Sequence, residues 1–174
     1  MGMRDDVLLP EDHVELDGLL DEVMSLLDMA DDLSVFRKLD LFWARLAMHI
    51  RAEHLHLFPA ILANLPDNSS NTSGVAGKLE LLRHDHDFFM RELAEAVRLF
   101  REISAETSQS TRTEVGEQLS RLRARLEKHN RIEEAEIYPL LADLKAHGDS
   151  DDLAALMKRE LDNLPPRFRT DSPE

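Results

Sequence analysis

Histidine and glutamate recur in one pattern in the two halves of the chain. Residues 44–62 and residues 124–142 align at a shift of 80, with identical residues at seven of the 19 positions. A second alignment, at a shift of 73, places Asp12-His13 over Asp85-His86. Each half therefore carries a single histidine and, further along, a His-x-x-x-Glu motif. The six residues that result are His13, His49, Glu53, His86, His129 and Glu133.

These six polar residues are expected to face the interior of the protein. Residues four apart lie one turn apart on the same face of a helix. His49 and Glu53 continue the apolar stripe that contains Leu46, and the second half repeats this arrangement. Buried polar groups cost free energy unless each has a partner. The six therefore need either a bound metal or, in the alternative interpretation, one another in a hydrogen-bonded network without metal.

The residue types indicate a centre with two metal ions. Four neutral imidazoles and two carboxylates suit Fe, Mn, Zn or Cu rather than Ca or Mg. Six ligands exceed what a single tetrahedral zinc takes, but they fit two ions, each capped by two histidines and bridged by both carboxylates. Such a centre leaves positions open to water, dioxygen, peroxide or nitric oxide, which is the structural condition for reactivity.

Two further polar residues follow the motifs. His56 and Glu136 lie seven residues beyond His49 and His129, a spacing that places them on the same helical face. His56 is expected either to supply a fifth imidazole or to serve as a hydrogen-bond partner or a polar group at a channel mouth. Whether His56 or Glu136 joins the ligands is left open.

The remaining histidines and aromatic residues have simpler interpretations. His84 is an alternative to His86 as the ligand of its helix. His54 follows Glu53 directly and should point away from the core. Tyr138 and Trp43 are redox-capable, but aromatic residues in a helical protein usually pack in the core, and we expect this of both.

The composition predicts that helices position these residues. The chain contains only 6 Gly and 7 Pro, whereas Ala, Leu, Glu and Arg, which favour helices, are abundant. Ser34 is the expected N-cap of the second helix, and Pro59 is expected to kink or shorten it. Residues 65–74 are turn formers and predict the loop between the halves. His147-Gly148 is the expected end of the fourth helix. Apolar residues at spacings of three and four predict helices over 11–30, 32–64, 75–104, 111–146 and 151–161.

Four helices joined by short loops predict an all-α, up-down-up-down four-helix bundle, with a short C-terminal helix in addition. At a rise of about 1.5 Å per residue, each pair of consecutive candidate ligands lies at a similar height from the turn between them. All six are thereby brought to one level of the bundle. We expect residues 1–146 to form the bundle and residues 147–174 to form a short helix and polar tail that packs on it or extends from it.

Charge and composition exclude several classes of function. The 174 residues include 21 Lys and Arg against 35 Asp and Glu, a net charge of −14. So acidic a surface disfavours binding to nucleic acid or to an anionic membrane. The chain has no Cys, which removes thiolate metal sites. No apolar run is long enough to span a membrane, so the expected location is cytoplasmic, and no protein partner is identified.

The doubled motif resembles that of the hemerythrin-like family of His-His-Glu cation-binding domains, over roughly residues 10–146. The resemblance implies two non-haem iron ions, oxo- or hydroxo-bridged, with the four histidines as terminal ligands and the two glutamates as bridges. Hemerythrins proper carry a His-x-x-x-His pair on the third helix, whereas Leu82 and Met90 occupy the positions four away from His86. This departure disfavours simple reversible oxygen carriage and leaves an additional exchangeable position.

Three functions follow as hypotheses. The first is a protein that binds or senses dioxygen, nitric oxide or peroxide at an open di-iron site. The second is an enzyme at the same site, either peroxidase- or catalase-like or converting nitric oxide. The third is an acidic helical interaction module with a structural metal. A ferritin-like carboxylate site built on Glu53-x-x-His56 is disfavoured, because the second half reads Glu133-x-x-Glu136.

Overall fold

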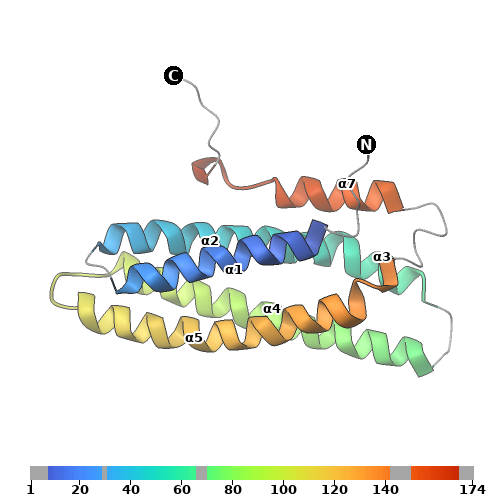
Figure 1. The fold of residues 1–174 in the computed structure, drawn as a ribbon, viewed down its shortest axis with the longest axis horizontal. Helices are drawn as coiled ribbons and strands as arrows, with labels where there is room; N and C mark the ends of the chain where they lie inside the picture. The colour runs from blue at the N-terminus through green and yellow to red at the C-terminus, as the bar shows by residue number, and fades with distance from the viewer. Residues whose placement is uncertain (1–7, 29–30, 66–69, 142–149, 169–174) are drawn as a thin grey trace, which may run out of the picture.

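Four long helices dominate the computed structural model, which describes residues 8–28, 31–65, 70–141 and 150–168. They lie side by side, and each runs opposite to the one before it (Figure 1). α1 and α4 each pack against both α2 and α5, so the four enclose one interior. Regular structure in the described residues is entirely helical, which confirms the all-α prediction. The bounds are α1 Leu8–Leu27, α2 Asp32–Ala52, α4 Ser70–Arg101 and α5 Ser108–Ile132.

The start of α2 differs from the sequence prediction. Its N-cap is Asp31, whose carboxylate accepts hydrogen bonds from the backbone N–H groups of Leu33 and Ser34 at 3.1 and 3.2 Å. Ser34, the expected cap, lies inside the first turn. Aspartate is as good an N-cap as serine and here reaches the unpaired amides from one turn earlier.

The start of α4 also corrects the prediction. The helix begins at Ser70, so residues 70–74 of the expected loop are helical, while residues 66–69 lie outside the described residues. Val75 and Leu79 are buried in the core. Packing of such an apolar face extends a helix through residues whose own helix propensity is low.

Both His-x-x-x-Glu motifs end in a wide helical turn. α2 passes into the π-helix η1 (Glu53–Leu57) and then into α3 (Phe58–Ala63), and α5 passes into the π-helix η2 (Glu133–Ile137). The backbone N–H that closes each turn donates to the carbonyl of the motif's glutamate, five residues back. Pro59 and Pro139 follow, and since proline clashes with the carbonyl four residues before it, the wide turn relieves that clash. The interruption expected at Pro59 is therefore present as a π-turn.

The apolar core forms two clusters on either side of a polar layer. On α1, Leu9 belongs to one cluster and Leu16 to the other, with His13 between them. On α4, His86 lies between Leu82 and Phe89 in the same way. The polar residues of the motif are thus sealed from both ends of the interior.

A further helix, α7 (Ser150–Leu161), covers part of this assembly. It matches the helix expected over 151–161 and packs against α2 and η1 (Figure 1). Met157 and Leu161 are buried in the apolar cluster that contains Leu57. The guanidinium of Arg51 donates to the carboxylate of Glu160 at 2.7 Å. α7 therefore contacts the turn that carries Glu53, and the 3-10 turn η3 (Pro166–Phe168) follows it.

The predicted domain boundary at residue 146 and the helix end at His147-Gly148 fall outside the described residues. Among the helices that are described, none combines the length and the apolar character needed to span a membrane.

Candidate metal centre

Six polar side chains converge in the layer between the two apolar clusters. They come from α1, α2 and its π-turn, α4, and α5 and its π-turn. The exposed fraction of each is 3% or less. The structure thus brings together all six residues of the doubled motif: His13, His49, Glu53, His86, His129 and Glu133.

The four histidines form two pairs, each supplied by one half of the chain. The ring centroids of His13 and His49 lie 4.9 Å apart, and those of His86 and His129 lie 4.6 Å apart. In the second pair the two Nε2 atoms approach to 2.9 Å. Each pair therefore offers two converging nitrogen donors.

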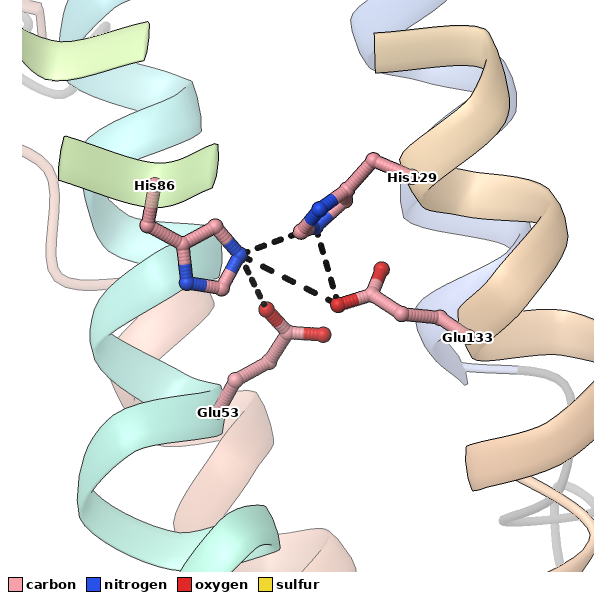
Figure 2. Close-up of side chains that lie close together, drawn as sticks. All are labelled: Glu53, His86, His129 and Glu133. Carbon is pink, nitrogen blue, oxygen red and sulfur yellow. Dashed lines mark hydrogen bonds and ion pairs between the residues drawn. The ribbon is translucent and has the colours of Figure 1, made fainter. Parts of the chain in front are cut away.

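Each glutamate reaches both histidine pairs. Oε1 of Glu53 lies 3.4 Å from Nε2 of His49, and its Oε2 lies 3.3 Å from Nε2 of His86. Oε2 of Glu133 lies 3.3 Å from Nε2 of His13, and its Oε1 lies 3.0 Å from Nε2 of His129. Figure 2 shows the two carboxylates facing the second pair. The two oxygens of each carboxylate are thus divided between the two pairs.

The outer ring nitrogens of the histidines are held by a second group of side chains. Nδ1 of His49 donates to Asp12 at 2.8 Å, and Nδ1 of His13 donates to Glu134 at 2.8 Å. In the other half, Nδ1 of His129 donates to Asp85 at 3.3 Å, and His86 shares a 2.9 Å hydrogen bond with Nε2 of His54. These contacts fix the ring orientations and direct all four Nε2 atoms inward.

Two arginines complete the repeated arrangement. Arg45 donates to Asp12 at 2.5 Å, and Arg125 donates to Asp85 at 2.6 Å. No role was predicted from the sequence for these four residues. The signal was available, because Arg45 aligns with Arg125 and Asp12 with Asp85 in the two repeats.

Tyr138 packs in the core, as predicted, and its hydroxyl also enters the polar layer. Its hydroxyl lies 3.0 Å from Oε1 of Glu53, 3.2 Å from Oε2 of Glu133 and 3.0 Å from Nε2 of His13. The hydroxyl therefore belongs to the polar layer, while the ring is buried in the apolar cluster that contains Leu57, as expected. The expectation is also confirmed for Trp43, which packs against the apolar cluster that contains Leu16 and Phe89.

The structure answers the open question about His56 and Glu136, neither of which faces the six residues, and it overturns the expectation that His54 points away from the core. A π-turn rotates the chain less per residue than an α-helix. His56 is consequently rotated away from the interior and lies 3.7 Å from Glu160 of α7. Glu136 pairs with Lys78 at the surface. The same reduced rotation keeps His54 beside Glu53, so it faces His86 rather than pointing away.

His84 does not take the place of His86. It lies at the surface with 67% of its side chain exposed, one turn from Glu80. Since two residues separate it from His86 along α4, it faces nearly the opposite side of the helix.

Protons and charges in this layer are strongly coupled. Burial alone would lower the pKa of His49, but the charge of Glu53 and the hydrogen bond to Asp12 raise it well above its ordinary value of 6.5. Burial likewise opposes the rise in the pKa of His129, which Glu133 causes. The pKa of Glu53 moves the other way: burial raises it, yet the neighbouring imidazoles hold it well below 4.5. Without metal, the charged forms of His49, His129 and Glu53 are therefore favoured.

The tyrosine hydroxyl keeps its proton. Burial and the charges of Glu133 and Glu53 raise the pKa of Tyr138 well above 10. It can therefore donate one hydrogen bond to a carboxylate in this layer at any ordinary pH.

The residues fit a bound cation. Within the described part of the chain, Oε2 of Glu53 and Oε1 of Glu133 are fully buried and accept no hydrogen bond. Ligand atoms of four residues (Glu53, His86, His129 and Glu133) lie within 4.8 Å of one another, and so do those of His13, His49 and Glu133. Nitrogen and carboxylate donors in this combination suit first-row transition metals.

Comparison with known proteins agrees with this chemistry. The family model of the hemerythrin HHE cation binding domain matches residues 7–141. The chain therefore belongs to the hemerythrin HHE cation-binding family. No curated protein and no solved structure matches it significantly.

Proposed function

We propose that the six residues hold two iron ions and that the protein binds or senses a small oxidant, namely dioxygen, nitric oxide or peroxide. The main support for this proposal is that each glutamate directs one carboxylate oxygen to each histidine pair. A carboxylate that bridges two metal ions has this arrangement. The fold we infer is the up-down-up-down four-helix bundle, with α7 packed on it as part of the same domain.

The size of the site supports a small ligand. A cavity of about 10 Å³ touches all four histidines and is otherwise lined mainly by apolar side chains such as Leu16 and Phe89. About 10–15 Å³ is the space that one water molecule needs. Bound iron would supply an open position for the oxidant, while the chain holds the ring nitrogens in place and keeps bulk water out.

Metal analysis tests this proposal. Protein purified without chelator is expected to contain close to two irons per chain, and azide or nitric oxide should change its optical spectrum without turnover. Glu53→Ala and Glu133→Ala should each lower the metal content, whereas Glu136→Ala, at the surface, should not. Absence of metal after anaerobic reconstitution with ferrous iron would refute the site.

A second candidate function is favoured by Tyr138. Its hydroxyl contacts both carboxylates and His13, so it is a proton donor beside the positions proposed for the metal ions, which favours an enzyme that decomposes hydrogen peroxide. General acid catalysis typically contributes roughly 100-fold or more, so Tyr138→Phe should reduce turnover of the iron-loaded protein by about that factor. A single stoichiometric reaction with peroxide, with no continuing turnover, would leave binding or sensing as the function.

A further inference from the structure

We propose that the two metal positions are unequal, and that the position at His13 and His49 binds its ion more tightly than the position at His86 and His129. The inference rests on the proposed two-metal site. It concerns the residues behind the ligands, which differ between two halves that are otherwise related by repetition.

The two metal positions differ in the side chains that form hydrogen bonds with the outer ring nitrogens of the histidines. At the first position both imidazoles donate to carboxylates, Asp12 and Glu134, each at 2.8 Å. At the second position His129 donates to Asp85 over a longer distance of 3.3 Å, and the partner of His86 is the imidazole of His54. A carboxylate behind a metal-bound histidine makes the imidazole a stronger donor, and an uncharged partner does so less.

His54 and Glu134 are equivalent positions in the repeat. Each follows the glutamate of its own motif directly, and each reaches across to the histidine supplied by α1 or α4 of the other half. The π-turns place both residues alike. The difference in residue type at these equivalent places therefore separates the two positions chemically while the backbone arrangement is repeated.

The inner face also differs between the two positions. The hydroxyl of Tyr138 lies 3.0 Å from Nε2 of His13, so a hydroxyl group stands beside the first position. Its equivalent in the other half is Phe58, whose ring stacks on His86 with centroids 6.0 Å apart. The second position thus has an apolar neighbour where the first has a polar one.

Calorimetric titration with Zn²⁺, which undergoes no redox change, tests the inference. The unaltered protein should show two binding events whose dissociation constants differ by roughly 10- to 100-fold, the usual effect of a partner behind a ligand. Anomalous diffraction from crystals grown with one equivalent of Zn²⁺ should show the ion at His13 and His49. Two equal events would overturn the inference and leave the two-metal site intact, whereas no binding would overturn the proposed function itself.

Two variants assign the cause. Glu134→Gln should weaken the tighter event by at least tenfold and leave the weaker one; since 46% of the Glu134 side chain is exposed, the fold should tolerate the change. His54→Glu places a carboxylate behind His86, as Glu134 does behind His13, and should bring the two events within about threefold of each other. Glu136→Gln, at the surface of the same turn as Glu134, is the control and should change neither event. Movement of the weaker event alone by Glu134→Gln would contradict the assignment.

Discussion

Carboxylates behind the clustered histidines fix the orientation of the imidazole rings. Asp12 holds His49 in the ring orientation that directs Nε2 inward, and Arg45 holds Asp12. We expect Asp12→Asn to weaken metal binding by roughly 10- to 100-fold, because an amide is a poorer acceptor for the Nδ1–H than a carboxylate. Competition against a chelator of known affinity measures the change.

A matched control isolates the contact with His49. Glu15 also accepts a hydrogen bond from Arg45, at 2.7 Å, but its own side chain is 68% exposed. Glu15→Gln should leave metal affinity within twofold of the original. Equal losses in both variants would mean that Arg45, rather than the orientation of His49, sets the affinity.

The protonation of the metal-free site gives a pH dependence of stability. The raised pKa of His49 means that its contribution to the free energy of unfolding is complete below about 6.5 and is lost as the pH rises through the folded-state value. The lowered pKa of Glu53 means that its contribution is complete above about 4.5 and is lost on acidification. Metal-free protein should therefore be most stable between pH 4.5 and 6.5.

Urea denaturation with a chelator at pH 5.5 and pH 8 measures this effect. We expect a smaller free energy of unfolding at pH 8, and we expect the stabilisation by metal to grow over the same interval, because metal replaces protons on the histidines. His49→Gln should reduce the pH dependence, and His84→Gln, at the surface, should preserve it. A free energy of unfolding that does not change with pH in the unaltered metal-free protein would contradict the link between protonation of His49 and stability.

At the level of single residues, repetition was the informative signal. It identified all six clustered residues, and it aligned Asp12 with Asp85, for which no role was predicted. The positions of His54, His56 and Tyr138 were not predictable from α-helical spacing, since the π-turns change the rotation between these residues and the preceding motif. A proline six residues after the glutamate in both halves was the available indication of that change.

At the scale of secondary structure, α7 ties the C-terminal segment to the site. Met157 is 2% exposed and lies in the apolar cluster with Leu57. Truncation of a buried methionine typically costs about 2–5 kcal/mol, so Met157→Ala should reduce the free energy of unfolding by roughly this amount. Lys158→Ala, on the exposed side of α7, should cost less than about 0.5 kcal/mol. Two separate unfolding transitions would show that α7 is not part of the same cooperative unit.

The helices were largely predictable, and their ends were not. Apolar spacing located every long helix because each buries a continuous stripe of side chains. Residues 70–74 were misassigned because glycine, serine and asparagine favour turns locally, whereas burial of Val75 and Leu79 extends the helix through them. The local preference is a few tenths of a kcal/mol per residue, which tertiary packing readily outweighs.

For the molecule as a whole, bound metal should act as a large stabilising ligand. A ligand present at about 100 times its dissociation constant stabilises the folded state by about 2.7 kcal/mol. For a chain of this size, 1 kcal/mol corresponds to a shift of roughly 2–4 °C in Tm. Metal removal should therefore lower Tm by roughly 5–10 °C in thermal melts with and without a chelator. Identical melts of fully loaded and metal-free protein would contradict a buried site.

The division of ligands between the halves has a consequence for chain topology. An ion held by His13 and His49 from the first half and Glu133 from the second joins positions 120 residues apart, since 133 − 13 = 120. Such an ion would act as a cross-link in a chain that has no Cys and hence no disulfide. Closing a loop of about 100 residues is worth about 4–5 kcal/mol in chain-entropy models. A chelator would open such a cross-link, whereas reduction by thiols would not. Its stabilising effect on the fold would therefore persist under the reducing conditions that cleave a disulfide.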